Sequence, residues 1–245
     1  MMRLALIGDP VEHSASPTLH RGFLDEAGID GEYVAIRVAR GDGARAIRRL
    51  RADGFTGCNV TYPLKEEAFE VSEARSDEAR RARAVNTIFF GREILGTTTD
   101  GAGARTAIEA LLDEPVALKR IGVLGYGATA RAVLAALQEN DAYAFVWGRD
   151  AERVSQTCRH FEAKPWPDNP PEIVISTLPP QASLPDDLIA QLRSADVVMD
   201  ANYGDRSRLA YRLNREVIPG DAMLEAQARA SFDFWLAHLD RVAGG

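Results

Sequence analysis

Two short segments in the first hundred residues carry polar side chains that could bind a small molecule. His13, Ser14 and Ser16 stand directly before Pro17, a residue that favours the first turn of a helix. Two hydroxyl groups would then lie beside the free backbone N–H groups of a helix N-terminus, an arrangement that suits a carboxylate. The alternative is structural, with Ser16 capping the helix and Ser14 turning the chain.

The second segment lies at the end of a predicted strand, Phe55–Val60. Asn59, Thr61 and Lys65 lie at or beyond the carboxyl end of that strand, and open α/β sheets bind ligands at such ends. A lysine in this place can transfer a proton or stabilise a developing negative charge. Taken alone, it would be an ordinary solvated side chain.

Asn86 and Asp100 add an amide and a carboxylate to the same part of the chain. Asn86 stands in the sequence Ala-Val-Asn-Thr, and Asp100 precedes Gly101. An aspartate before a glycine is also a common turn residue. Each of these polar residues therefore has a structural explanation when it is considered by itself.

A third segment has the spacing of a dinucleotide-binding loop. Gly125, Gly127 and Ala130 occupy the three positions of G-x-G-x-x-A, after a predicted strand and at the start of a predicted helix that begins with Ala128. The first glycine would allow the tight turn, the second the approach of the pyrophosphate, and the alanine close packing of helix and strand. These four residues are the predicted cofactor-binding residues of the loop. A glycine turn without a ligand is the alternative.

The residues after the next predicted strand bear on the choice of cofactor. Arg149 and Asp150 stand side by side at its end. An arginine in this place pairs with the 2′-phosphate of NADP, whereas an acid binds the ribose hydroxyl of NAD. Asp150 could also cap the following helix. Arg149 therefore favours NADP, and NAD stays the alternative.

The elements that position these segments form two successive strand–helix patterns. The first has strands at 4–7, 33–38 and 55–60 and helices at 17–27 and 43–51, then charged helical segments and a hairpin of strands 85–90 and 94–97. After a helix at 102–112, the second has strands at 121–124, 144–147, 173–176 and 197–201 and helices at 128–138, 151–160 and 186–193. This order predicts the α/β class, with an N-terminal α/β domain, 1–100, and a Rossmann-like domain, 101–220. An amphipathic last helix, 221–240, would complete the first domain.

Composition and charge exclude several classes of partner. The 245 residues carry a net charge of −7 and show no basic stripe, which disfavours nucleic acid. No stretch approaches the roughly 20 apolar residues of a membrane helix. Cys58 and Cys158 lack the spacing of metal ligands, so we expect no metal site and two reduced thiols in a cytoplasmic protein.

In their order and spacing, these segments resemble the shikimate dehydrogenase family. The resemblance covers essentially the whole chain and is carried by an S-x-S-P entry, an N-V-T-x-P-x-K loop, an A-V-N-T turn, a T-D-G segment, a tyrosine after a late strand, and M-L-E-A-Q in the last helix. It implies a substrate-binding and catalytic first domain, with Lys65 and Asp100 as the catalytic pair. It also implies these substrate contacts: Ser14 and Ser16 for a carboxylate, and Asn59, Thr61, Asn86, Asp100, Tyr203 and Gln227 for or near ring hydroxyls.

The implied function is the reversible, NADP-dependent reduction of 3-dehydroshikimate to shikimate, a small anionic hydroaromatic acid, by a monomer or homodimer. A quinate or aminoshikimate dehydrogenase and a non-catalytic regulatory protein of the same fold are the alternatives. The chain departs from the family pattern at three places. Thr98 replaces the asparagine of N-T-D, the loop Gly125-Tyr126-Gly127-Ala128-Thr129-Ala130 replaces G-A-G-G-A-A, and Gly148-Arg149-Asp150 replaces N-R-[TS].

Overall fold

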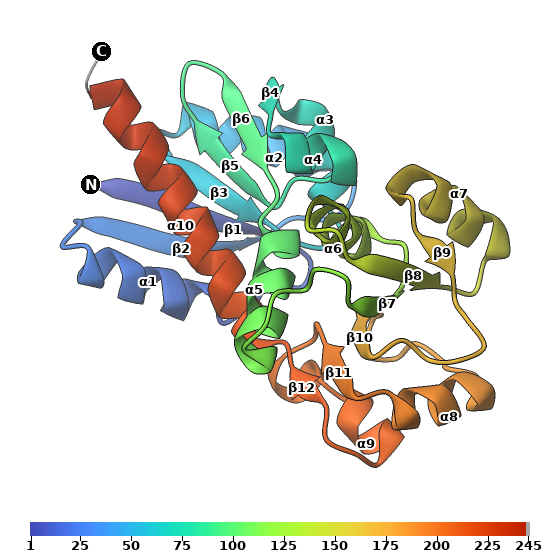
Figure 1. Ribbon diagram of the computed structural model, residues 1–245. Coiled ribbons are helices and arrows are strands. Elements are labelled where there is room, and N and C mark those ends of the chain that lie inside the picture. Colours follow the sequence, from blue (N-terminus) through green and yellow to red (C-terminus); the bar gives the residue numbers. More distant parts are fainter. Residues whose placement is uncertain (244–245) are drawn as a thin grey trace. The chain divides into compact units, whose positions relative to one another are not determined.

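The computed structural model describes residues 1–243, with side chains described as far as Leu239, and divides the chain into two compact units. Unit 1 consists of Met1–Asp100 together with the chain from Gln227 onward, and unit 2 is Gly101–Ala226. Each unit contains a six-stranded sheet with helices packed on both faces (Figure 1). The α/β class predicted from the sequence is confirmed.

Unit 1 contains the following elements up to residue 97: β1 (Met2–Gly8), α1 (Ser16–Glu26), β2 (Gly31–Arg37), α2 (Gly43–Ala52), β3 (Gly57–Val60), α3 (Lys65–Val71), β4 (Ala74–Arg75), α4 (Asp77–Ala82), β5 (Thr87–Phe90) and β6 (Ile94–Thr97). The strand order in its sheet is β2-β1-β3-β5-β6-β4. β2, β1 and β3 are parallel, whereas β5 runs antiparallel to both β3 and β6. The carboxyl ends of β1 and β3 therefore lie at one edge of the sheet, where β5 begins and β6 ends.

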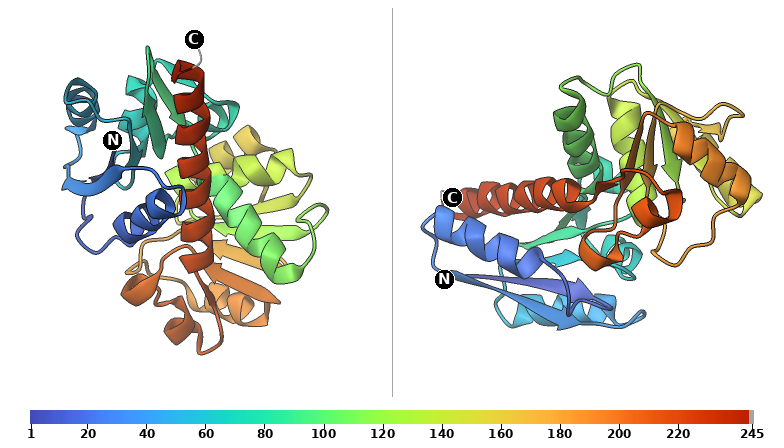
Figure 2. Two further views of the ribbon diagram at one scale, coloured as in Figure 1. Left: turned by 90° about the vertical axis from the view of Figure 1, so that its left-hand side faces the viewer. Right: turned by 90° about the horizontal axis from the view of Figure 1, so that it is seen from below.

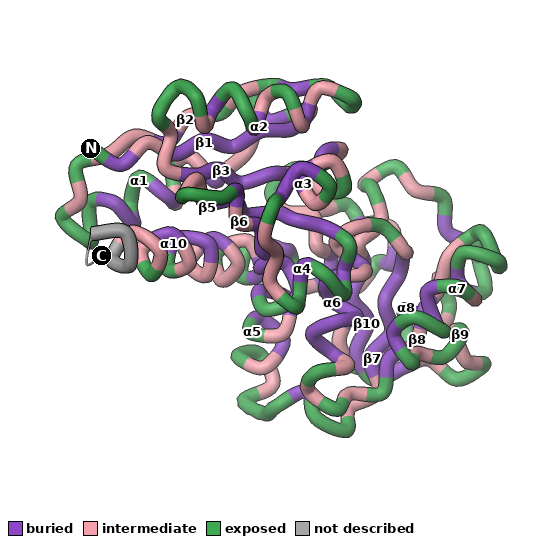
Figure 3. The backbone as a smooth tube through the Cα atoms, turned by 90° about the horizontal axis from the view of Figure 1, so that it is seen from above, coloured by how far each residue is buried: buried purple, intermediate pink, exposed green. Residues whose placement is uncertain are grey.

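Two apolar clusters hold helices against this sheet. On one face α2, α3 and α4 cover the strands through residues that include Ile47, Leu50 and Val71. On the other face α1 and α10 (Asp221–Ala243) cover them, and Phe232 and Trp235 of α10 pack with the apolar residues of β1 (Figures 1 and 2). β1, β3, β5 and β6 are buried along most of their length between these layers, whereas β2 is partly exposed (Figure 3).

Unit 2 contains α5 (Asp100–Leu112), β7 (Arg120–Leu124), α6 (Ala128–Glu139), β8 (Tyr143–Trp147), α7 (Ala151–Phe161), β9 (Lys164–Pro165), β10 (Ile173–Ser176), α8 (Asp186–Ser194), β11 (Val197–Asp200), a 3-10 turn (Gly204–Arg206), α9 (Leu209–Leu213), β12 (Ile218–Pro219) and the start of α10. The strand order in its sheet is β12-β11-β10-β7-β8-β9, and every pair is parallel. Because parallel strands need crossover helices, both faces are covered.

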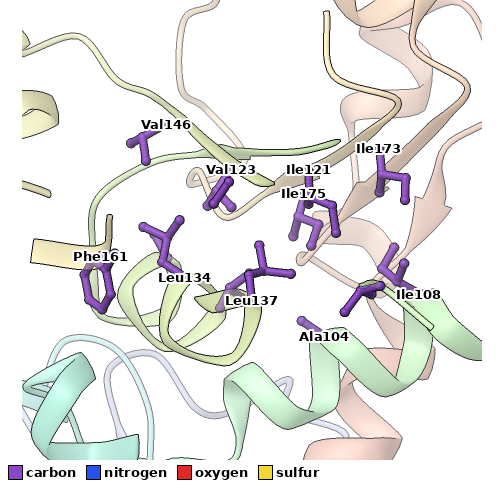
Figure 4. Packing of buried hydrophobic residues seen from close by; sticks show 14 of the residues in the cluster. Ala104, Ile108, Ile121, Val123, Leu134, Leu137, Val146, Phe161, Ile173 and Ile175 are labelled. Atoms are coloured by element: carbon purple, nitrogen blue, oxygen red, sulfur yellow. The ribbon is translucent and has the colours of Figure 1, made fainter. Parts of the chain in front are cut away.

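The larger apolar cluster of unit 2 lies between the sheet and helices α5, α6 and α7. Figure 4 shows Leu134 and Leu137 of α6 beside Ile121, Val123 and the neighbouring strands. Helices α8 and α9 cover the opposite face with a second cluster. Since β7 and β10 are buried on both sides, they appear in the sequence as short continuous apolar runs rather than as alternating patterns, whereas one face of β8 is partly exposed.

The structure corrects two expectations about the helices. Ser16 is the first residue of α1 rather than its cap, because Ala15 at the N-cap position has a helical backbone and provides no side-chain cap. The sequence predicts that the last helix, 221–240, completes the first domain. From Gln227 onward the helix belongs to unit 1, whereas its residues up to Ala226 cluster with unit 2, where Met223 is part of the apolar cluster.

None of the helices within residues 1–243 is long and apolar enough to cross a membrane.

Candidate active site

Lys65 and Asp100 form an ion pair at the sheet edge of unit 1. Lys65 is the first residue of α3 and Asp100 the first of α5. Their side chains are only 13% and 7% exposed, so the charges interact in a region of reduced dielectric constant. A carboxylate is favoured at a helix N-terminus, whereas a lysine there is not. The position of Lys65 is therefore electrostatically unfavourable for its own helix and is offset by Asp100.

Asn86 fixes the carboxylate of this pair. Its Nδ2 donates to Asp100 Oδ1 at 2.8 Å, to Thr99 Oγ1 at 2.9 Å and to Gln227 Oε1 at 3.2 Å. Its Oδ1 accepts from the Thr99 N–H at 2.9 Å. The side chain thus joins the start of β5, the segment before α5 and helix α10. The structure brings together four of the residues predicted from sequence, Lys65, Asn86, Asp100 and Gln227.

Asn59 lies behind this cluster, with its amide engaged by protein groups. Its Oδ1 accepts from Tyr33 Oη at 2.8 Å, and its Nδ2 lies 3.1 Å from both Thr87 Oγ1 and Ser231 Oγ. The Ser231 hydroxyl is also 3.1 Å from Thr99 Oγ1. These contacts make Asn59 a support of the Asn86 turn, and they leave its role as a ligand of substrate a prediction.

The far side of Asn59 is closed by aromatic packing. His20 stacks on Tyr33 with ring centroids 4.4 Å apart and lies 5.2 Å from Trp235. Burial lowers the pKa of His20 to about 3, so its imidazole is neutral near pH 7. Neither ring nitrogen has a hydrogen-bond partner among the described residues. His20 therefore fixes the Tyr33 ring and is not suited to proton transfer at neutral pH.

Ser14 and Ser16 face each other on the segment after β1. Ser14 Oγ lies 3.2 Å from Ser16 Oγ and accepts from the Ser16 N–H at 3.2 Å. Ser14 is half-buried and Ser16 buried. The two hydroxyls form a compact pair on α1 and the turn before it, and no other predicted site residue among those described is in hydrogen-bond contact with them. A carboxylate site at these serines stays a prediction.

Thr61 begins the loop after β3, and this loop packs tightly on the end of β1. A Cβ at Gly8 would lie 2.4 Å from Thr61 Cγ2 and 2.8 Å from the Tyr62 carbonyl oxygen, so only glycine allows this approach. Thr98, at one departure from the family pattern, is buried, and its Oγ1 has no hydrogen-bond partner among the described residues.

The glycine loop of unit 2 joins β7 to α6. Gly125 has φ = +115°, which only glycine adopts readily, and a Cβ there would lie 2.6 Å from Thr177 Oγ1. Gly127 is the N-cap of α6 and provides no side-chain cap, so the N–H groups of Ala128 and its successors are not occupied by it. A Cβ at Gly127 would meet nothing within 4 Å, and Ala130 is fully buried against the strand. The loop has an open surface over a helix N-terminus, which suits a pyrophosphate.

The turn after β8 contains Arg149 and Asp150. Asp150 is the N-cap of α7, and its Oδ1 accepts from the Arg153 N–H at 3.1 Å. The capping alternative for Asp150 is confirmed. Arg149 is exposed. The sequence interpretation does not single out Arg153, whose guanidinium lies over the Tyr126 ring at 4.3 Å from the ring centroid. The sequence does contain one signal for Arg153, because an arginine three residues after a predicted helix cap lies near the glycine loop.

Tyr203 belongs to unit 2, where it precedes the 3-10 turn after β11, and it is half-buried. Its carbonyl oxygen accepts from the Arg206 N–H at 3.2 Å. The buried Asp200 holds this segment by accepting from the N–H and the Nδ2 of Asn202 at 3.1 and 2.8 Å. Burial raises the pKa of Asp200 above its usual value. Among the described residues, no group of three or more His, Cys, Asp or Glu side chains could hold a metal ion.

Comparisons with known proteins agree with this architecture. Residues 6–88 match the family described as the shikimate dehydrogenase substrate binding domain. The shikimate dehydrogenase (NADP⁺) of Methylocella silvestris is 34% identical over 265 residues, which cover 98% of this chain and 92% of that relative. The chain belongs to the shikimate dehydrogenase family. The resemblance that the sequence motifs indicated is therefore confirmed.

Other members of the shikimate dehydrogenase family are similar over different extents. The shikimate dehydrogenase (NADP⁺) of Acidiphilium cryptum is 44% identical over 161 residues, which cover 65% of this chain and 58% of that relative. The matched part thus spans less than two thirds of that relative's length. The shikimate 5-dehydrogenase of Thermus thermophilus, solved in complex with NADP(H) and shikimate, superimposes with a TM-score of 0.83 and 29% identity over 96% of this chain and 93% of the other.

Proposed function

We propose that the protein is a shikimate dehydrogenase that reduces 3-dehydroshikimate to shikimate reversibly, with NADP as the cofactor. The observation that carries this proposal is the buried network of Lys65, Asp100 and Asn86, with Gln227 bound to it. An ion pair that lies at a sheet edge and is held by an amide is suited to transferring one proton in a fixed direction. Membership of the family and the complex of the Thermus relative support the choice of substrate and cofactor.

In this proposal the residues of unit 1 bind the ring and move the proton. Ser14 and Ser16 bind the substrate carboxylate, while Thr61, Asn86 and Gln227 hold ring hydroxyls. Lys65 Nζ donates the proton to the ketone oxygen during reduction, because an ammonium beside a carboxylate carries the transferable proton. Asp100 holds that ammonium in place before the transfer, and the neutral amine takes up a proton from water afterwards to restore the ion pair. A bound nicotinamide dinucleotide supplies the hydride.

Unit 2 fits such a dinucleotide. The open surface at Gly127, the positive φ of Gly125 and the start of α6 at Ala128 would form a phosphate cradle, and the buried Ala130 lets the helix pack closely on the strand. The first turn of α6 contains no acidic residue that would repel a phosphate. Arg149 at the end of β8 would bind the 2′-phosphate. Since the Asp150 carboxylate accepts from backbone at the start of α7, it is directed away from this task.

The test of this function is a set of steady-state assays with shikimate, quinate and aminoshikimate, each with NADP⁺ and NAD⁺. We expect the highest kcat/KM for shikimate with NADP⁺. A higher kcat/KM for quinate or aminoshikimate would mean that the reaction type is correct but that the substrate is the other acid. No turnover of any of the three, in a protein that binds NADP⁺, would instead support a non-catalytic protein of the same fold.

The serine pair makes a separate prediction about substrate binding. Ser14→Ala combined with Ser16→Ala should raise KM for shikimate at least about tenfold, because each hydrogen bond from a hydroxyl to a carboxylate contributes about 1.5–3 kcal/mol. The change in kcat should be small. The control is Thr18→Ala, which removes an exposed hydroxyl from the same helix. An unchanged KM in the double variant would contradict a carboxylate site at these serines.

The two residues after β8 make a prediction about cofactor choice. Arg149→Ala should raise KM for NADP⁺ about tenfold or more and leave KM for NAD⁺ nearly unchanged, because the lost bonds are to a group that NAD⁺ lacks. Asp150→Ser should improve NADP⁺ use only slightly, since the carboxylate serves as a helix cap and serine can replace it. A wild-type preference for NAD⁺ would mean that Asp150, and not Arg149, binds the ribose.

Two finer points accompany the proposal. We expect the enzyme to act in the cytoplasm, in keeping with its two buried free cysteines, and fractionation of cells that produce it would test this. We also expect a monomer or a homodimer, which sedimentation of the purified protein would distinguish.

A further inference from the structure

Two of the three departures from the family pattern lie against each other in unit 2. Tyr126 stands between the two glycines of the loop, and its ring covers Gly148, the residue after β8. A Cβ at Gly148 would lie 2.4 Å from Tyr126 Cε1 and 2.5 Å from Cδ1. Real Cβ atoms do not approach another carbon so closely. The tyrosine ring therefore occupies the space that a side chain at residue 148 would need, and the two departures are one structural feature.

The Tyr126 ring also contacts a cationic side chain, that of Arg153. The Arg153 guanidinium lies 4.3 Å from the centroid of Tyr126, within the range of a cation–π interaction. The backbone of Arg153 is fixed because its N–H donates to the capping carboxylate of Asp150. Arg153 thus reaches from the first turn of α7 to the glycine loop, with the ring as its support.

The charges around Arg153 favour an anion as its partner. Arg149 is exposed on the same turn. The nearest acid along the helix, Glu152, accepts from Gln156 Nε2 at 2.9 Å and lies 3.8 Å from Arg159 Nη2. Asp150 is used as a cap. Two guanidinium groups therefore flank a turn whose carboxylates are directed elsewhere, and a phosphate dianion is the ligand that such a pair binds best.

The glycine loop and the end of the second strand bracket the adenosine ribose in dinucleotide-binding sheets. We propose that Tyr126 is a positioning residue for the 2′-phosphate of the cofactor: its ring holds Arg153 at this phosphate, and Gly148 is required to make room for the ring. This inference rests on the proposed use of NADP. It adds that the ring, rather than a polar side chain at residue 148, organises the phosphate site in this chain.

The test measures dissociation constants by calorimetry for NADP⁺ and NAD⁺, and for adenosine 2′,5′-bisphosphate and 5′-AMP. Tyr126→Leu should weaken NADP⁺ and the bisphosphate about five- to tenfold and leave NAD⁺ and 5′-AMP within about twofold, because the support of Arg153 is lost. Tyr126→Phe keeps the aromatic face and should keep all four constants. An equal loss for all four ligands in Tyr126→Leu would overturn the proposal.

Gly148→Ala is the second variant for which the dissociation constants are measured. It should weaken NADP⁺ binding in the wild-type background by displacing the ring, and it should add little in the Tyr126→Leu background. Additive effects of the two substitutions would contradict a shared role. Phe145→Leu is the matched control, because it removes another arginine–aromatic pair of unit 2, Arg120 over Phe145 at 5.3 Å, and should change none of the constants.

Different results would contradict the proposed function and the role of Tyr126. A wild-type protein that binds neither dinucleotide, or that prefers NAD⁺, would contradict the proposed function itself. A wild-type protein that prefers NADP⁺ but keeps this preference in Tyr126→Leu would contradict only the role of Tyr126.

Discussion

Lys65→Met should reduce kcat for shikimate oxidation by about 10²- to 10⁴-fold and leave KM for shikimate within about threefold. The methionine keeps the length and apolar stem of the side chain but has no proton to transfer. It also leaves the buried Asp100 without its ion-pair partner. The measurement is steady-state kinetics with both substrates varied, and a kcat within about threefold of wild type would rule out acid–base or electrostatic work by Lys65.

A matched control separates this effect from the loss of a lysine–carboxylate pair as such. Lys119 pairs with Glu114 at 2.5 Å in unit 2, where the pair is exposed to solvent. Lys119→Met should leave kcat and KM unchanged, because an exposed pair contributes little. Binding of shikimate to the Lys65→Met protein, measured by calorimetry, would show that the site is still formed.

Trp235→Ala should produce the largest loss of stability in unit 1, about 3–5 kcal/mol. The side chain is fully buried between α10 and the sheet, and its Nε1 donates to the Ile88 carbonyl oxygen at 2.8 Å. Alanine would leave both a cavity and a buried carbonyl group without a partner. Urea unfolding followed by circular dichroism measures the change.

The neighbouring Phe234 provides the comparison, because it is only partly buried on the same helix. Phe234→Ala should cost clearly less than Trp235→Ala. If both substitutions cost about the same, or if Trp235→Ala costs less than about 1 kcal/mol, the packing of α10 on the sheet would not be what stabilises unit 1.

The regular elements of both units could be predicted because their residues have clear periods and boundaries. The run Ile121–Leu124 and the glycine after it identify β7, and Gly91–Glu93 identifies the hairpin of β5 and β6. The two-residue strands β4, β9 and β12 are too short to produce any pattern. The capping role expected of Ser16 is wrong because the backbone at Ala15 continues the helical conformation, which no single side chain reveals.

The site residues that come shortly before or after predicted strands could be identified from the sequence. Lys65, Asn86 and Asp100 are predicted from the sequence and lie together. The sequence predicts Asn59 as a ligand, but its burial among Tyr33, Thr87 and Ser231 could not be foreseen, because all four residues of β3 are buried and the sequence shows no alternation. The stacking of Arg153 on Tyr126 brings the first turn of α7 onto a loop distant in sequence, so only the structure reveals this contact.

Unit 1 takes residues from before and after unit 2, and this has a consequence for synthesis on the ribosome. When β1 leaves the exit tunnel, the apolar residues that it presents to Phe232 and Trp235 have no cover, because α10 is translated only after all of Gly101–Ala226. At ordinary translation rates that interval lasts on the order of ten seconds. The nascent first unit therefore keeps an exposed apolar face during this interval, whereas the second unit is continuous in sequence and can already fold. We expect chaperones that bind exposed apolar surfaces to bind the nascent first unit.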